Sequence, residues 1–128
     1  MTADLNALAE QAYLDLDDET KKYLVDRGFT EEFIAIKKPG VFIVDDEKRL
    51  SIPVRDVTGK CIALKLRELP GHTHEGADKY LNHPTGSPVT LFGLESVDLS
   101  KPVIFCEGEL DCWIMQQLGF NCLTSTGG

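Results

Sequence analysis

The interval between apolar residues changes near residue 40, and no other feature of the sequence restricts the possible folds as strongly. Before that point, apolar residues recur every three or four positions, as in Leu5, Leu8 and Ala12, which is typical of amphipathic helices. From Val41 onward the interval is two, which is typical of β-strands. We therefore expect a mixed fold, α+β with an α/β end, in which a small helical N-terminal part (residues 1–40) comes first.

Three short helices are expected in this helical part. The first carries its apolar stripe as far as Leu16, the second covers residues 18–27, and the third covers residues 31–36. Gly28 supplies a left-handed stop for the second helix. The residues from which the three helices start are, in order, Thr2 or Asp4, Asp17 or Asp18 as an N-cap, and Thr30 as an N-cap.

The middle segment, residues 41–100, is expected to form an antiparallel β-hairpin followed by an irregular connection. Alternating apolar residues predict strands over residues 41–44, 49–56 and 60–67. Residues 68–88 contain prolines, glycines and three histidines without any periodicity, which predicts a long loop. Loops of that length are more often functional than accidental.

The register of the hairpin follows from its three-residue loop, residues 57–59. A loop of this length with glycine in third position favours a turn followed by a bulge, and it pairs Asp56 with Lys60. The same register places Ile52 opposite Leu64 on one apolar face. The cations on the other face would then be Arg49, Arg55, Lys65 and Arg67, with Arg49 directly opposite Arg67.

The last segment, residues 101–128, is expected to be a strand, helix, strand unit with a right-handed crossover. The continuous apolar run over residues 103–106 is typical of a parallel strand that is covered on both faces. A helix over residues 109–118 and a strand over residues 121–124 follow. Because this sheet is small, we expect either that it extends the sheet of the middle segment or that the sequence is an N-terminal piece of a longer protein.

Charge and hydropathy restrict the possible partners. The net charge is −8, whereas proteins that coat nucleic acid are usually basic, so any phosphate contacts must lie in a local patch. Residues 37–100, with nine acidic and nine basic side chains, are the candidate region. No apolar stretch is longer than four residues, so we expect a cytoplasmic protein without a signal peptide, membrane anchor or membrane partner.

Cysteine and histidine spacing argues against a structural zinc site. No C-x-x-C pair is present, so buried, reduced thiols are expected rather than a disulfide framework or a zinc ribbon. His72 and His74 lack a third ligand at zinc-site spacing and are expected to be solvated. The four cysteines are Cys61, Cys106, Cys112 and Cys122.

Glu107 and Asp111 are the candidate metal-binding pair. Ligands of open α/β sheets bind beyond the carboxyl ends of the strands, where Glu107 is expected, and Asp111 follows in the first helical turn. Carboxylates without histidine or thiolate companions favour hard cations such as Mg²⁺. The spacing alone favours a simpler interpretation, in which Asp111 and Glu109 complement the helix dipole while Glu107 is solvated.

Several motifs, taken in order, resemble those of a known family. The run over residues 103–111, with residues 118–120 and 124–128, is similar to the first half of a Toprim domain, the metal-dependent fold of bacterial-type DNA primases and topoisomerases. Upstream motifs extend the resemblance to the RNA-polymerase core of bacterial, phage and plasmid primases over roughly residues 18–128. These upstream motifs are residues 23–29, 52–56 with Gly59, 66–67, 79–84 and 91–94.

The resemblance implies roles for individual residues. It implies that Glu107 is the catalytic acid of the first Toprim motif and that Asp111 assists a site for Mg²⁺ or Mn²⁺. It also implies a single-stranded DNA template, ribonucleoside triphosphates and a replicative helicase as partners. The residues that it implies for nucleotide or template binding are Arg67, Lys79, Tyr80 and Asn82, with Arg55 as a weaker candidate.

The expected function is therefore that of a DNA primase fragment, from a bacterial or mobile-element replication system, whose complete form joins ribonucleotides by metal-dependent nucleotidyl transfer. The family's site also needs an Asp-x-Asp on the next strand, and nothing after Gly128 supplies it, so the fragment alone is expected to be inactive. One alternative is a non-catalytic nucleotide-binding or DNA-binding module with a degenerate Toprim half. Another is a different Toprim enzyme, such as a nuclease.

Overall fold

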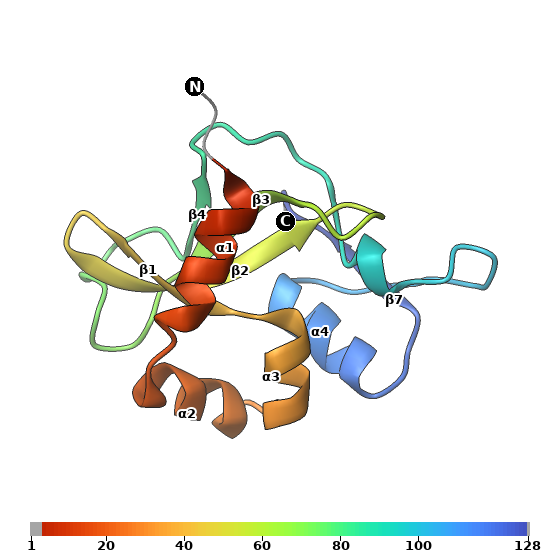
Figure 1. Cartoon of the computed structure of the whole chain (residues 1–128), viewed down its shortest axis with the longest axis horizontal. Helices are drawn as coiled ribbons and strands as arrows, with labels where there is room; N and C mark the ends of the chain where they lie inside the picture. The colour runs from red at the N-terminus through yellow and green to blue at the C-terminus, as the bar shows by residue number, and fades with distance from the viewer. Residues whose placement is uncertain (1–3, 128) are drawn as a thin grey trace.

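The computed structural model describes residues 4–127, which form a mixed fold with two β-sheets (Figure 1). The helices are α1 (Leu5–Leu14), α2 (Asp18–Asp26), α3 (Glu31–Lys37) and α4 (Glu109–Gln117). The first sheet has the order β1-β2-β3-β4 and contains β1 (Gly40–Val44), β2 (Glu47–Arg55), β3 (Cys61–Arg67) and β4 (Tyr80–His83). The second sheet has the order β5-β7-β6 and contains β5 (Leu91–Phe92), β6 (Ile104–Phe105) and β7 (Cys122–Ser125). The predicted mixed fold class is confirmed.

Each of the three N-terminal helices begins after a side-chain cap. The three helices are only seven to ten residues long, so capping satisfies backbone N–H groups that would otherwise lack partners. The predicted starts are confirmed, and the structure chooses between the alternatives. The caps and the N–H groups that donate to them are Asp4 with Ala7, Asp17 with Thr20, and Thr30 with Phe33.

Helix α1 lies across the first sheet and packs against β1 and β3 (Figure 1). Gly40, the first residue of β1, permits the close approach, because a Cβ atom there would lie 2.2 Å from the backbone of Ala12. On the sheet side, Leu64 and Leu66 of β3 are fully buried and share a cluster with Ala9 of α1. One face of the sheet is therefore covered by the first helix of the chain.

The predicted hairpin register is correct at the turn and wrong beyond it. The amide of Asp56 donates to the carbonyl of Lys60 (2.9 Å). A bulge between Val54 and Arg55 then shifts the pairing by one residue. Beyond the bulge, the pairs that replace the predicted ones include Val54 with Ala63, Ile52 with Lys65, and Leu50 with Arg67, so Arg49 and Arg67 are not opposite each other.

Burial of both faces of the sheet explains the error. The register prediction assumes that one face is apolar and the other is polar. In the structure, Leu64 faces α1, whereas Ile52 on the opposite face shares a core with Trp113 of α4. Apolar residues therefore occupy both faces, and matching apolar partners cannot identify the register. Arg49 is buried and donates to the carbonyl groups of Leu66 and Asp78 instead of facing an anion.

Strand β4 lies inside the region that the sequence predicts to be an irregular loop. It pairs with the edge of β3, with Arg67 opposite Tyr80 and Leu64 opposite His83. A strand of four residues is too short to show periodicity, and its pairing partner is distant in sequence. Strand pairing therefore fixes the positions of Tyr80 and Asn82, which the sequence predicts to lie on a loop.

The C-terminal residues form the predicted parallel unit of strand, helix and strand. β6 pairs with β7 in parallel, and α4 connects them. β6 lies at the edge of the second sheet, so Ile104 (43% exposed) and Phe105 (65% exposed) are not covered on both faces, contrary to the prediction. Within residues 4–127 this sheet does not extend the first one, because the strand order β5-β7-β6 contains no strand of the first sheet.

One apolar core joins the helical part to the C-terminal unit. Trp113 of α4 is 1% exposed and makes edge contacts with the rings of Phe29 and Phe33. The side chain of Gln117 adds polar links, because it donates to the carbonyl of Gly28 and accepts from the amide of Thr30. Among residues 4–127, no helix is long and apolar enough to cross a membrane.

Candidate functional site

A cleft of about 820 Å³ lies between two walls that come from different sheets. One wall consists of side chains from β3, β4 and the residue before β4, and we call it the basic wall: Lys65, Arg67, Lys79, Tyr80 and Asn82. The other wall follows β6 and begins α4, and we call it the acidic wall: Glu107, Glu109 and Asp111.

Strand pairing aligns the side chains of the basic wall. Arg67 of β3 lies opposite Tyr80 of β4, and Lys65 lies opposite Asn82. Because side chains two residues apart point to the same face of a strand, these four project together toward the cleft. Lys79 immediately precedes β4 and adds a fifth polar side chain at the cleft edge.

Tyr80 lies at the centre of the basic wall. Its hydroxyl accepts a hydrogen bond from Nη1 of Arg67 (2.6 Å), and the Arg67 guanidinium carbon lies 5.4 Å from the ring centroid. The ammonium groups of Lys65 and Lys79 lie 5.4 and 6.0 Å from the same centroid. Burial raises the pKa of Tyr80, so the phenol remains a neutral hydrogen-bonding group among the cations.

Lys65 connects the two walls at the bottom of the cleft. Its side chain is 9% exposed, and its Nζ donates to the carbonyl of Thr126 (2.5 Å) beyond β7. Nζ also lies 4.0 Å from a carboxylate oxygen of Glu109. Burial raises the pKa of Glu109, and the positive charges of Lys65 and Arg67 offset only part of that increase.

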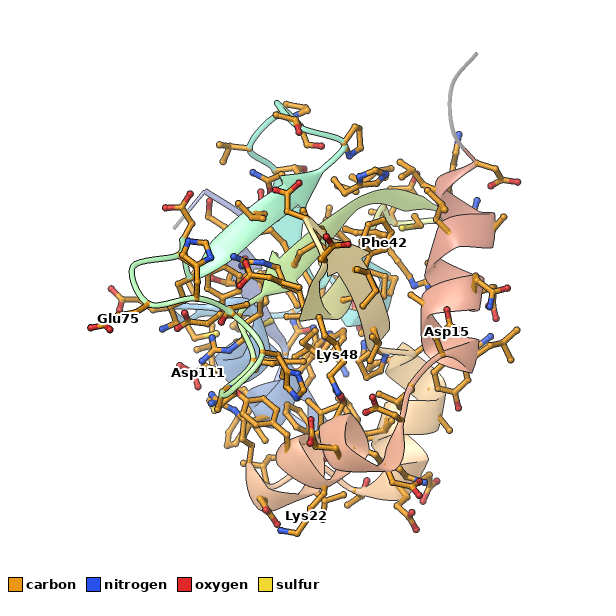
Figure 2. All side chains as sticks on the ribbon, turned by 90° about the vertical axis from the view of Figure 1, so that its left-hand side faces the viewer. Asp15, Lys22, Phe42, Lys48, Glu75 and Asp111 are labelled. Atoms are coloured by element: carbon orange, nitrogen blue, oxygen red, sulfur yellow. The ribbon has the colours of Figure 1, made fainter. Side chains whose placement is uncertain are left out.

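The other two acidic side chains are exposed. Among residues 4–127, no hydrogen bond or ion pair involves the side chain of Glu107 or Asp111, and Figure 2 shows Asp111 at the surface. Gly108 lies between Glu107 and the first residue of α4 with a φ of +85°, a conformation that favours glycine. Two free carboxylates on one cleft wall form a donor set that suits a hard cation such as Mg²⁺.

The structure brings six of the seven predicted site residues into this one cleft. Arg55 is the exception, because its Nη1 donates to the carbonyl of Gly59 (3.2 Å) at the hairpin end and it does not line the cleft. The functional roles of all seven remain predictions. The six that line the cleft are Arg67, Lys79, Tyr80, Asn82, Glu107 and Asp111.

Three charged cleft residues, Arg27, Lys65 and Glu109, are absent from the predicted site. Strand alternation does place Lys65 on the same hairpin face as Arg67, as expected from the sequence, but no role in the site was predicted for Lys65. Glu109 offered no such signal, because acidic residues are common in first helical turns. Only the packing of α4 against the first sheet distinguishes this buried carboxylate, which is 3% exposed, from its exposed neighbours.

Comparisons with known proteins agree with the resemblance. A scan against models of protein families finds no match. A curated DNA primase of Chlamydia pneumoniae is 33% identical over 90 residues, which is 63% of this chain and 15% of that protein. The chain therefore spans a small part of this curated relative.

Solved structures share the fold. The RNA polymerase domain of Mycobacterium tuberculosis primase DnaG, solved with a double-stranded DNA oligomer that has a 6-nucleotide overhang, matches with a TM-score of 0.77 and 20% identity over 98% of this chain and 53% of that one. A DnaG primase catalytic domain bound to single-stranded DNA matches with a TM-score of 0.74 and 22% identity over 96% and 52%. The predicted resemblance to a bacterial-type primase catalytic core is confirmed, and the chain spans about half of these structures.

Proposed function

We propose that this chain is the part of a DNA primase catalytic core that carries the nucleotide and template cleft, within a protein that makes RNA primers on a DNA template. The observation that supports this most directly is the arrangement of the cleft. A row of cations around Tyr80 faces two unpaired carboxylates, Glu107 and Asp111, across one groove. The DNA bound by the two solved primase structures gives independent support.

The basic wall suits phosphate and bases. Arg67 and Lys79 can donate charge-assisted hydrogen bonds to phosphate oxygens of a triphosphate or of a DNA backbone. Arg67 is positioned in advance, since two tyrosine hydroxyls, those of Tyr80 and Tyr23, hold its guanidinium. Tyr80 offers a ring face, and Asn82 offers an amide, to a base that lies in the cleft.

The acidic wall suits a divalent cation, and Glu107 and Asp111 would hold it. When bound, Mg²⁺ or Mn²⁺ would orient the triphosphate and neutralise charge on the transferred group. Glu109 is too buried to play the same part, and it orients Lys65 instead. Ribonucleoside triphosphates and a replicative helicase are the further partners that this proposal includes.

Binding of a fluorescent single-stranded oligonucleotide tests the proposal, with Arg67→Ala compared to Arg55→Ala. Both substitutions remove one arginine from the same hairpin, but only Arg67 lines the cleft. We expect Arg67→Ala to weaken binding and to reduce the slope of log affinity against log salt by about 1, while Arg55→Ala binds like the original chain. Equal losses in the two variants would contradict a binding cleft at the basic wall.

A further inference from the structure

Three of the four cysteines converge behind the acidic wall. Cys106 follows β6, Cys112 lies in α4 and Cys122 begins β7, so each element of the strand, helix, strand unit contributes one thiol. The three sulfur atoms all lie within 4.8 Å of one another, and those of Cys106 and Cys122 are 3.2 Å apart. Sequence spacing concealed this cluster, because the three residues contain no C-x-x-C motif.

These distances match a metal site that has nearly formed. Zn–S bonds of about 2.3 Å around a tetrahedral ion place the sulfur atoms about 3.8 Å apart. The observed separations, from 3.2 Å to at most 4.8 Å, bracket that value, so small side-chain rotations would suffice. Only weak contacts would have to be given up, such as those of the Cys112 sulfur with the carbonyl oxygens of Phe92 (3.9 Å) and Cys122 (3.5 Å).

The cluster is enclosed on one side and open on the other. Cys112 and Cys122 are 0% exposed, whereas Cys106 is partly exposed and lines the cleft. An ion could therefore enter from the cleft, and water could fill a fourth position on the Cys106 side. Three thiolates select thiophilic ions over hard ions such as Mg²⁺.

We propose that Cys106, Cys112 and Cys122 form a three-thiolate site for a thiophilic closed-shell metal ion, of which Zn²⁺ and Cd²⁺ are representatives. Binding replaces three S–H protons by three metal–sulfur bonds without any change of oxidation state. Cys106 and Cys112 are the direct neighbours in sequence of Glu107 and Asp111. A bound ion would thus link β6, α4 and β7 directly beside the two exposed carboxylates of the cleft.

A titration of the reduced chain with Cd²⁺ tests this site, because Cd–thiolate bonds give an ultraviolet charge-transfer band. We expect the band to saturate at one ion per chain and to persist in excess Mg²⁺. Cys106→Ser removes the least buried ligand and should weaken Zn²⁺ and Cd²⁺ binding by about tenfold or more, since even the loss of an indirect partner of a metal ligand costs that much.

Cys61→Ser is the matched control. Cys61 is also a free, buried cysteine, but it packs in the cluster beneath α1, so its loss should leave Cd²⁺ binding unchanged. Zn²⁺ should raise the unfolding temperature of the original chain and of Cys61→Ser by similar amounts, and that of Cys106→Ser by clearly less. The proposal is overturned by an absent band, by displacement of the ion with Mg²⁺, or by equal effects of the two substitutions.

Discussion

The two walls of the cleft are built in opposite ways. On the basic wall, Arg67 is held by two tyrosine hydroxyls, and Lys65 is held by a backbone carbonyl and a carboxylate. On the acidic wall, Glu107 and Asp111 are exposed and make no hydrogen bond or ion pair within residues 4–127. The fold itself therefore orients the cations, whereas the two carboxylates remain available for a ligand.

Glu109 shows why the contrast depends on burial rather than on charge. It belongs to the acidic wall, yet it is 3% exposed and lies near the ammonium group of Lys65. Its side chain is thus held by the fold, as the cations of the basic wall are. A buried carboxylate needs a partner, because its desolvation is costly. Exposed carboxylates carry no such requirement, so substitutions at buried charges should affect stability more than substitutions at exposed ones.

Lys65→Met should have the largest effect, because it leaves the carboxylate of Glu109 buried without its partner. We expect the free energy of unfolding at neutral pH to fall by about 3 kcal/mol, as measured by urea denaturation. Burial raises the pKa of Glu109 from its ordinary value of 4.5, so folding favours its protonated form relative to the unfolded chain. The contribution of Glu109 to stability should therefore be fully present below pH 4.5 and be lost as the pH rises through the folded-state pKa.

The double variant Lys65→Met with Glu109→Gln is the control for this interpretation. It removes the buried charge along with the ammonium group, so most of the lost stability should return. A loss in Lys65→Met of equal size at acidic and at neutral pH would mean that packing of the lysine stem, and not the unpaired carboxylate, is responsible.

Tyr80→Phe should have an intermediate effect. It deletes the hydroxyl that accepts from Arg67 at 2.6 Å but keeps the ring that the three cations surround. A hydrogen bond to a charged group contributes about 1.5 kcal/mol, and the partial exposure of this pair places the expected loss at or below that value. Thermal unfolding at neutral pH measures it. Unchanged stability would indicate that Arg67 is held by packing alone.

Asp17→Ala should lower the free energy of unfolding by about 1 kcal/mol. Asp17 is a paired carboxylate, in contrast to Glu107 and Asp111. Asp17 caps α2 and accepts from Lys48 (2.8 Å), which points toward this helix in Figure 2. Partial burial alone would raise its pKa, but hydrogen bonds from Lys48 and Thr20 outweigh that effect and lower the pKa to about 2.

Because the folded-state pKa of Asp17 is depressed, its contribution is present above about pH 3.8 and is lost as the pH falls toward about 2. The difference in unfolding free energy between the original chain and Asp17→Ala, measured by urea denaturation followed by circular dichroism, should therefore be largest above about pH 3.8 and shrink as the pH falls toward about 2. A difference of constant size over that pH range would refute this linkage.

Glu107→Gln should have the smallest effect on stability, either none or a slight increase, since the carboxylate has no partner to lose and is relieved of repulsion from Asp111. Its consequence should be confined to cation binding. Low Mn²⁺ concentrations should broaden the amide signals near Glu107 and Asp111 first in the original chain, and later in the variant. Glu75→Gln, an exposed carboxylate in the loop before β4 (Figure 2), should leave the broadening unchanged.

Short-range features could be predicted from the sequence, and the site only in part. Helix starts at Asp17 and Thr30 were predictable, because capping acts over three residues. The register of β2 and β3 was not predictable, because a bulge between Val54 and Arg55 shifts the pairing. Burial of both faces also removes the apolar–polar alternation on which the prediction relied. Strand β4 was not predictable either, because its pairing with β3 joins residues more than ten positions apart.

Residue order alone accounts for the succession of the elements and for the chemical groups available to a site: the caps, the turn at Gly59, the parallel unit and the run from Glu107 to Asp111. Which of those groups meet depends on the packing of the elements. Packing buried Glu109 against Lys65, excluded Arg55 from the cleft and brought three thiols together behind it. Periodicity and capping act between neighbours in the chain, whereas desolvation and charge pairing depend on distances that packing sets.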